Sequence, residues 1–337
     1  MRASPFHVFP RHPRYALFLL IVLIPTFYLL LPLRLDPPLT PLRFPPNEST
    51  DLAYRMAQAE VIYQKTLKDR DGLIARYGPH PSDLDMFPPN KSPWPAYTVW
   101  DYFPAAFNCP HEVRRIGLLG DGGKWVCGLS RLVDKKDCVV YSVGINRESS
   151  FEGDLLINTN YCRVWGYDPS VKGFAKQIPA SERHRTTFHR YALAGVDRPA
   201  SESEPAMYTL NTLMQMNEHQ YIDILKVDVE GWEFDTFTNL IKSFAEQDLP
   251  LPFGQLQLEI HVWDKKFDYF LKWWEGLEEV GLRPFWTEPN LVYVNYAGSR
   301  KPELAEYSFL NIKGENSILS MTMMSIGLCS LDLFSRL

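Results

Sequence analysis

The feature that most constrains this chain is a series of short apolar runs, separated by segments long enough to form a helix. Several of the runs end in glycine or aspartate. Short buried strands that alternate with helices are typical of a mostly parallel sheet with crossover helices, so we predict an α/β fold. The runs are residues 138–144, 162–168, 186–195, 223–231 and 255–263.

Two residues at the ends of consecutive runs indicate a nucleoside site. Ligands of parallel sheets bind beyond the carboxyl ends of the strands. Gly144 lets the backbone approach a ligand closely, and Asp168 follows 24 residues later, near the spacing at which a carboxylate binds ribose hydroxyls. The sequence contains neither G-x-G-x-x-G nor G-x-x-x-x-G-K-[ST]. This disfavours a dinucleotide site and a nucleoside triphosphatase.

Four polar residues in the fourth and fifth runs form the candidate catalytic group. Side chains two apart in a strand face the same way, so we expect Asp228 to share a face with Glu230, and Glu259 with His261. A carboxylate or an imidazole can remove a hydroxyl proton. We predict Asp228 and His261 as the working pair, with Glu230 and Glu259 placing the acceptor or orienting the imidazole. A buried structural network is the alternative, and a divalent ion is possible, although we assign no metal site.

A set of motifs gives a more specific indication. Residues 138–312, with a hairpin in front of them, resemble the FkbM-like group of class I S-adenosylmethionine-dependent methyltransferases, particularly its eukaryotic methyltransferase-like branch. LKVDVEGWE is the most distinctive of the motifs. In chain order they are GDGGKWVC, VVYSVGINRESSFE, VWGYDPS, YALAG, TLNTL, IDILKVDVEGWEFD, LQLEIH and EYSFLN.

The resemblance implies a fold, a cofactor and a set of contacts. The fold would be Rossmann-like, with a seven-stranded, mostly parallel sheet and helices on both faces. S-adenosyl-L-methionine would be the cofactor, with the Gly144 turn holding its methionine part, Asp168 its ribose and Leu193 to Gly195 flanking its adenine. The residues expected to bind it are Gly144, Ile145, Asn146, Phe151, Glu152, Asp168, Pro169, Leu193 and Ala194.

The N-terminal segment predicts a membrane anchor. Residues 15–33 are uncharged and long enough to cross a bilayer as a helix, and arginines precede them in the expected cytosolic segment 1–14. We therefore expect a single-pass type II membrane protein with its bulk in the lumen of the endoplasmic reticulum or Golgi. A cleaved signal peptide and secretion are the alternative, but no small-residue cleavage site follows the apolar run.

Proline content sets the expected boundaries in the rest of the chain. Before residue 111 lie 18 of the 27 prolines, so we predict a proline-rich stalk over residues 34–108, with a short helix at residues 51–77. The methyltransferase domain would span residues 109–314, followed by a tail of unknown role at 315–337. Asn47 and Asn90 stand in glycosylation sequons of the stalk.

Cysteines and charge bear on the compartment and the partners. Cys109, Cys127, Cys138 and Cys162 allow three disulfide pairings in an oxidising lumen, and buried thiols are the alternative. If the strands that follow Cys138 and Cys162 are parallel neighbours, those two residues lie side by side.

The net charge of −5 divides into +3 for residues 1–50 and −8 for the remainder. An acidic domain disfavours nucleic acid as a partner.

The predicted function is methyl transfer from S-adenosyl-L-methionine, most plausibly to an oxygen of a glycan or small molecule in the secretory pathway. A lumenal glycosyltransferase is one alternative, because Asp228-Val229-Glu230 resembles a metal-binding D-x-D triplet. A catalytically inactive methyltransferase fold that serves as a binding module is another. The tryptophans at 263, 273, 274 and 286 could line a sugar or lipid face, although packing in the core is the default interpretation.

Overall fold

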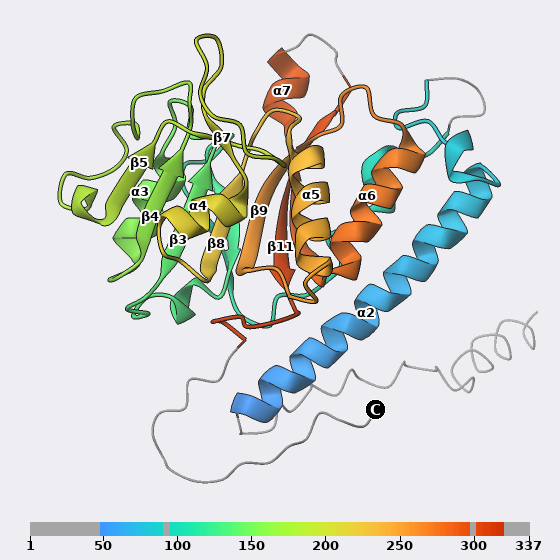
Figure 1. Cartoon of the computed structure of the whole chain (residues 1–337). Helices are drawn as coiled ribbons and strands as arrows, with labels where there is room; N and C mark the ends of the chain where they lie inside the picture. The colour runs from blue at the N-terminus through green and yellow to red at the C-terminus, as the bar shows by residue number, and fades with distance from the viewer. Residues whose placement is uncertain (1–47, 90–94, 297–300, 320–337) are drawn as a thin grey trace, which may run out of the picture. The chain divides into compact units, whose positions relative to one another are not determined.

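The computed structural model of the chain describes residues 48–89, 95–296 and 301–319 (Figure 1). At its centre is a sheet of seven strands in the spatial order β10-β11-β9-β8-β3-β4-β5. The strands are β3 (Val139–Val143), β4 (Arg163–Tyr167), β5 (Thr186–His189), β8 (Ile222–Val227), β9 (Phe253–His261), β10 (Leu282–Pro289) and β11 (Leu304–Asn311).

The strand directions match the sequence-based prediction. All neighbouring strands from β9 to β5 run parallel. Strand β11 lies between β9 and β10 and is antiparallel to both. The predicted seven-stranded, mostly parallel sheet is therefore confirmed. The chain order reverses between β3 and β8, and such a reversal is where open α/β sheets bind their ligands.

Helices and a hairpin cover the two faces of the sheet. One buried core contains Leu213, Phe237 and Phe270, whereas a second contains Val126 and Leu155. The first core is therefore covered by three helices, which lie in front of the sheet in Figure 1. They are α4 (Leu210–Met216), α5 (Glu233–Ala245) and α6 (Phe267–Glu279). The second is covered by α3 (Ser150–Asn158) and by the hairpin of β1 (Val113–Ile116) and β2 (Lys124–Cys127).

Apolar spacing explains why these helices pack as they do. In α5 the buried residues Phe234, Phe237 and Leu240 recur every third position and form one stripe. Helix α6 buries Trp273 and Trp274 together with its phenylalanines. Core packing, the default interpretation of these two tryptophans, is thus correct.

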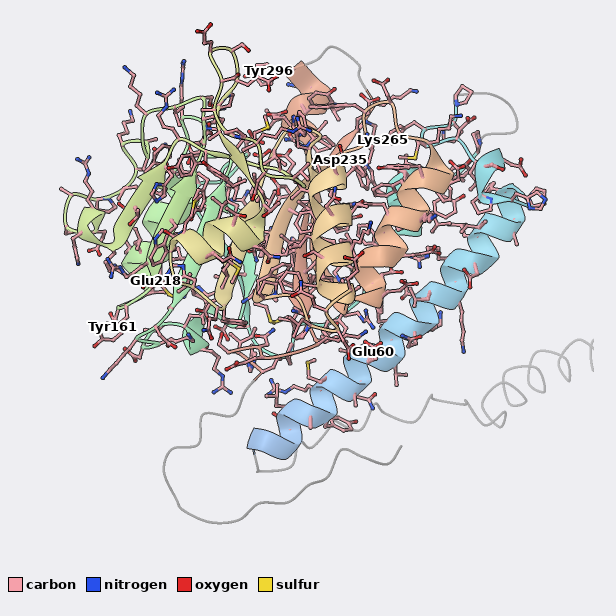
Figure 2. All side chains as sticks on the ribbon, in the orientation of Figure 1. Glu60, Tyr161, Glu218, Asp235, Lys265 and Tyr296 are labelled. Carbon is pink, nitrogen blue, oxygen red and sulfur yellow. A yellow bond between two sulfur atoms is a disulfide. The ribbon has the colours of Figure 1, made fainter. Side chains whose placement is uncertain are left out.

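The helix predicted at residues 51–77 exists but is not part of a separate stalk. Helix α2 (Glu48–Tyr77) contacts β10 and α6. Glu60, labelled in Figure 2, accepts hydrogen bonds from Arg283 of β10 at 2.9 and 3.0 Å. Arg70 donates to Glu278 at 2.9 and 2.7 Å, and both side chains are buried. The compact unit accordingly begins at Ser49, not near residue 109. One buried and one part-buried ion pair, which amphipathic spacing does not reveal, hold the helix on the domain.

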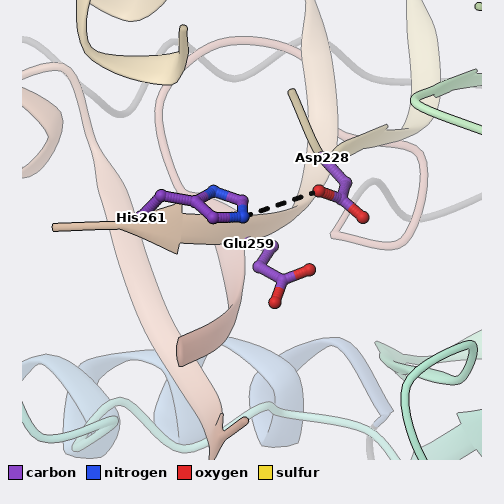
Figure 3. A group of neighbouring side chains, drawn as sticks. All are labelled: Asp228, Glu259 and His261. Carbon is purple, nitrogen blue, oxygen red and sulfur yellow. Dashed lines mark ion pairs between the residues drawn. The ribbon is translucent and has the colours of Figure 1, made fainter. Parts of the chain in front are cut away.

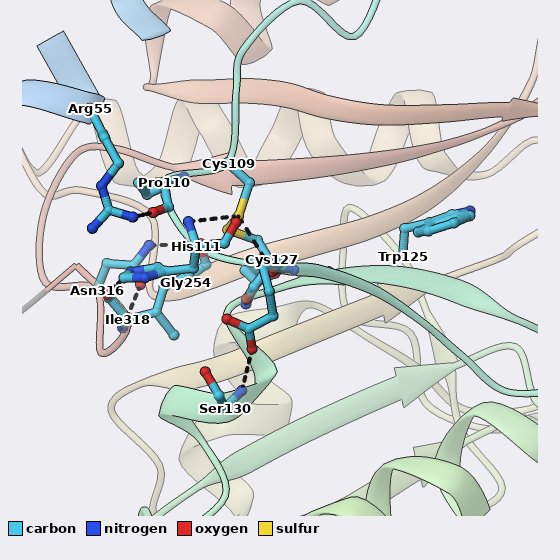
Figure 4. Close-up of a disulfide and its surroundings, with 12 residues drawn as sticks. Arg55, Cys109, Pro110, His111, Trp125, Cys127, Ser130, Gly254, Asn316 and Ile318 are labelled. Atoms are coloured by element: carbon cyan, nitrogen blue, oxygen red, sulfur yellow. Dashed lines mark hydrogen bonds between the residues drawn. A yellow bond between two sulfur atoms is a disulfide. The ribbon is translucent and has the colours of Figure 1, made fainter. Parts of the chain in front are cut away.

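Two disulfides join the four cysteines. Cys138 and Cys162 precede paired strands, where Val139 lies opposite Arg163, and their Cα atoms are 4.4 Å apart. Cys109 pairs with Cys127 and closes the base of the β1–β2 hairpin (Figure 4). The side-by-side placement of Cys138 and Cys162 is confirmed, and it selects one of the three pairings that the sequence allowed.

Some predictions concern residues that the structure does not describe. The anchor at 15–33, the segment 1–14, both sequon asparagines and residues 320–337 lie outside the described ranges. Within those ranges, no helix combines the length and the hydropathy that a membrane span requires. The first residues of the predicted tail pack on the domain, since Asn316 and Ile318 are buried and the Ile318 carbonyl contacts the His111 ring at 2.7 Å.

Candidate active site

The turn after β3 is built on a close backbone approach at Gly144. Its φ is 77°, and a Cβ atom there would lie 1.8 Å from the carbonyl oxygen of Asp228. Only glycine fits both the dihedral angle and the space. The carbonyl of Gly144 accepts a hydrogen bond from the buried Lys226 ammonium at 2.7 Å. The turn is therefore fixed against the end of β8.

Asp168, at the end of β4, holds the same turn from the other side. Its Oδ2 accepts the backbone N–H groups of Ile145 at 2.9 Å and Asn146 at 2.7 Å. Its Oδ1 accepts the backbone N–H and the hydroxyl of Ser170 at 2.7 and 2.6 Å. Burial raises the pKa of Asp168, but these hydrogen bonds outweigh it and lower the pKa below the ordinary value. Asp168 is thus an ionised clamp on the Gly144 turn.

A cavity of about 420 Å³ opens beside this turn, at the carboxyl ends of β3, β4 and β8. Part of its wall comes from predicted cofactor residues and part from predicted catalytic residues, so the structure brings these two groups together. The predicted residues on the wall are Gly144, Asn146, Asp168, Pro169, Leu193, Asp228 and Glu230.

The other predicted cofactor residues lie elsewhere. Ile145 and Phe151 are buried, with Phe151 in the core beneath α3. Glu152 is buried and accepts a hydrogen bond from the Ser142 hydroxyl. Ala194 lines a neighbouring cavity between α4 and α5. The sequence placed these residues near the strand ends, but it could not show that they do not line the cavity.

Asp228 and Glu230 reach the cavity from a turn, not from a strand. Strand β8 ends at Val227, and Glu230 has a φ of 52°, in the left-handed region. The expected shared strand face for these two residues is therefore wrong. They nevertheless meet at one atom: Nε2 of His261 lies 4.0 Å from Oδ1 of Asp228 and 3.5 Å from Oε2 of Glu230.

His261 is held by Glu233, a residue that the sequence-based assignment did not include. Oε1 of Glu233 lies 2.9 Å from Nδ1 of His261 and accepts the backbone N–H of His261 at 2.6 Å. Both side chains are buried. Burial lowers the pKa of His261, but the hydrogen bond and charge of Glu233, with the charges of Asp228 and Glu230, raise it above the ordinary value. Glu233, instead of Glu230 or Glu259, orients the imidazole through Nδ1 and leaves Nε2 facing Asp228 and Glu230.

A second ion cluster lies beside this group on β9 and β11. Glu259 stands opposite Glu306 across the two strands, and the buried Lys124 of β2 pairs with Glu306. Burial, followed by the charges of Glu306 and Asp228, raises the pKa of Glu259 well above its ordinary value. Burial lowers the pKa of Lys124, but Glu306, Glu259 and Asp228 outweigh it and raise the pKa. The cluster therefore keeps its lysine charged and has more carboxylates than cations.

Three of these side chains have the composition of a metal-binding group. Asp228, Glu259 and His261 each offer a ligand atom, and these atoms lie within 4.8 Å of one another (Figure 3). Carboxylate oxygens and an imidazole nitrogen suit several divalent ions. Lys124 lies in the same cluster, and its positive charge opposes a cation there. The three ligand atoms suit a divalent ion by type, whereas the positive charge of the neighbouring Lys124 ammonium disfavours one.

Comparison with known proteins identifies the family. A family model described as a methyltransferase domain matches residues 73–298, more than half of the chain. The chain belongs to this methyltransferase-domain family. Its predicted Rossmann-like methyltransferase fold agrees with the strand order described above. The match begins in the last turns of α2 and ends beyond α7.

Curated relatives of this methyltransferase-family chain carry a related name. The probable methyltransferase-like protein 24 of Homo sapiens is 30% identical over 138 residues, which are 40% of this chain and 35% of that protein. The Rattus norvegicus protein of the same name is 27% identical over 139 residues, covering 40% of this chain and 36% of that protein. The chain thus matches about a third of the length of each relative. The predicted resemblance to eukaryotic methyltransferase-like proteins is confirmed.

Two solved structures of similar fold have sequences that are only distantly similar to this chain. Methyltransferase FkbM from Methylobacillus flagellatus is 12% identical with a TM-score of 0.32, over 52% of this chain and 44% of that chain. The Methanococcus jannaschii fibrillarin pre-rRNA processing protein has the same identity and TM-score, over 66% of this chain and 76% of that chain. TM-scores of this size are too low to support an inference about function.

Several residues on the cavity wall of the methyltransferase domain were not predicted from the sequence as site residues. Trp232 belongs to the LKVDVEGWE motif, and Tyr191 begins YALAG, so both stood in stretches already singled out. Met207 and Pro205 lie far from any strand end in the predicted series. They reach the cavity because β7 (Met207–Tyr208) pairs with β6 (Ala192–Leu193), a short pairing with no periodicity to reveal it.

Proposed function

We propose that this chain transfers a methyl group from S-adenosyl-L-methionine to a hydroxyl oxygen. The observation that carries the proposal is the single cavity shared by Gly144, Asp168 and Leu193 on one side and by Asp228 and Glu230 on another. A nucleoside cofactor held by the first group would present its reactive methyl to the second. The family match supports the same chemistry.

The residues on the cofactor side bind and orient. The rigid Gly144 turn would hold the methionine part of the cofactor, and Leu193 would pack against its adenine. The carboxylate of Asp168 already accepts four hydrogen bonds, about as many as its lone pairs allow. Ribose hydroxyls would therefore replace the two bonds from Ser170, whereas the bonds from the Ile145 and Asn146 N–H groups keep the turn in place.

The residues on the acceptor side handle the proton. Asp228 lines the cavity, whereas His261 is only 1% exposed and lies behind it, so the acceptor hydroxyl would contact Asp228 first. Burial lowers the pKa of His261, but the hydrogen bond and charge of Glu233 raise it above the ordinary value, so the imidazole can hold the proton. Asp228 would accept the proton and pass it to Nε2 of His261, which Glu233 anchors.

We also propose a lumenal location. Two disulfides support an oxidising compartment, since such bonds are rare in the cytosol. The uncharged segment 15–33 would tether the chain as a type II membrane protein. Protease digestion of sealed microsomes tests this arrangement, because a lumenal domain survives until detergent is added and a cytosolic domain does not.

Calorimetry with the purified full chain separates this function from its rivals. S-adenosyl-L-methionine and S-adenosyl-L-homocysteine should bind at one site, and a nucleotide sugar such as UDP-glucose should not. The reverse result would indicate the glycosyltransferase alternative. Binding of both cofactor forms without methyl transfer to any hydroxyl acceptor would favour the inactive binding module.

A further inference from the structure

A second cavity lies next to the polar cluster, beyond the residues that line the cofactor cavity. It measures about 190 Å³, and Asp121, Asn290 and Glu306 are on its wall. The amide of Asn290 donates to Asp121 at 2.9 Å and also to Glu259 at 2.9 Å. Glu259 in turn lies within 4.8 Å of Asp228 on the cofactor cavity. A short chain of polar side chains therefore connects the two cavities.

An aromatic surface borders this second cavity. Trp125 of β2 donates through Nε1 to Oε2 of Glu288 at 2.8 Å, and Glu288 is on the cavity wall. The ring of Trp125 stacks on that of Trp286, with centroids 3.9 Å apart and an interplanar angle of 26°. Trp286 is 36% exposed, so the pair presents part of an indole beside hydrogen-bonding groups.

The charges on the wall of the second cavity restrict the chemical class of ligand that it can bind. Asp121, Glu288 and Glu306 contribute carboxylates, and the one arginine of the wall, Arg115, already contacts Glu288 at 3.4 Å and the Gly120 carbonyl at 2.5 Å. The negative charge of a phosphate, sulfate or fatty-acid carboxylate would be repelled by these carboxylates. A neutral ligand with many hydroxyls can donate to the carboxylates instead.

The wall also has an apolar side. Leu291 and Val292, at the start of α7 (Leu291–Tyr296), line the cavity and are 68% and 45% exposed. Sugar rings have apolar C–H faces as well as hydroxyl edges, and they use both when an aromatic face lies beside polar groups. We propose that this second cavity binds a neutral carbohydrate acceptor, whose reacting hydroxyl extends to Asp228 in the first cavity. Its role as acceptor site rests on the methyl-transfer function proposed above.

A glycan array probed with the labelled full chain tests the proposal. We expect binding to neutral glycans, weakened at least tenfold by Trp286→Ala and by Glu288→Gln. Tyr161→Ala is the matched control, because Tyr161 is also an exposed aromatic residue but lines neither cavity. This control should bind glycans as the wild type does. Glu288→Gln changes no side-chain volume, so it remains informative if Trp286→Ala fails to fold.

Three outcomes would overturn the inference: no glycan binding, binding to anionic glycans alone, or neutral-glycan binding that both variants leave unchanged. Calorimetry with S-adenosyl-L-homocysteine on the same proteins keeps the two proposals distinct. Retained cofactor binding without glycan binding contradicts only the carbohydrate site. If the folded wild type does not bind S-adenosyl-L-homocysteine, the proposed function itself is contradicted.

Discussion

The two sides of the active site are built in different ways. On the proposed cofactor side, Gly144 and Asp168 follow neighbouring strands and are fixed by hydrogen bonds in which one partner is a backbone group. On the acceptor side, His261, Glu259 and Lys124 come from different elements and are fixed by side-chain contacts between charged groups. The first side tolerates no change of backbone geometry, whereas the second depends on the balance of charge. Substitutions should therefore affect the two sides in separable ways.

The largest effect is expected from Gly144→Ala. The new Cβ would clash with the Asp228 carbonyl, and the residue would need a positive φ, so the turn must move. We expect S-adenosyl-L-homocysteine affinity to fall by at least 100-fold in calorimetry. Gly173→Ala is the control, because nothing lies within 4 Å of its added Cβ. Wild-type affinity in Gly144→Ala would show that the cofactor does not use this turn.

On the acceptor side, His261→Gln should separate binding from turnover. His261 does not line the cofactor cavity, so the affinity for S-adenosyl-L-homocysteine should stay within about threefold of the wild type. Loss of a proton acceptor typically slows a reaction by about 10²–10⁴-fold. Transfer of labelled methyl groups to glycans from secretory vesicles measures the rate. Weakened binding with an unchanged rate would reverse the assigned roles.

A smaller and more specific effect is expected from Glu233→Gln. His261 must be neutral to accept a proton, so activity should rise as the pH passes upward through its pKa. Glu233 raises that pKa, and the substitution should therefore move the acidic limb of the pH–rate profile to lower pH. Glu246→Gln, at the exposed residue that follows the C-terminus of α5, is a control that should leave the limb in place. A limb that stays fixed in Glu233→Gln would exclude His261 as the proton acceptor.

The smallest effect is expected from chelation. If the proton passes to His261, then EDTA treatment followed by dialysis should leave both cofactor affinity and methyl transfer unchanged. Asp228, Glu259 and His261 would serve as metal ligands only if an ion overcame the repulsion of Lys124. A loss of activity that Mg²⁺ or Mn²⁺ restores would reassign these three residues as ligands.

The sequence predicted what depends on local patterning. Apolar runs located the strands of the parallel half of the sheet, and strand ends located Gly144, Asp168 and Asp228 at the cavity. Patterning could not show that Glu233 turns back from α5 to His261 or that Lys124 reaches Glu306, because both are long-range side-chain contacts. The same reason explains why α2 was assigned to a stalk, since its ion pairs with Glu278 and Arg283 involve residues more than 200 positions away.

Direct photolabelling tests the central claim, that one cavity holds the cofactor between the Gly144 turn and Asp228. The full chain is irradiated with methyl-labelled S-adenosyl-L-methionine, and the labelled peptides are identified by mass spectrometry. Label on peptides that contain Tyr191 or Trp232, abolished by excess S-adenosyl-L-homocysteine, is the predicted result. Label confined to the cavity between α4 and α5, where Asn211 and Ser243 lie, would contradict the account.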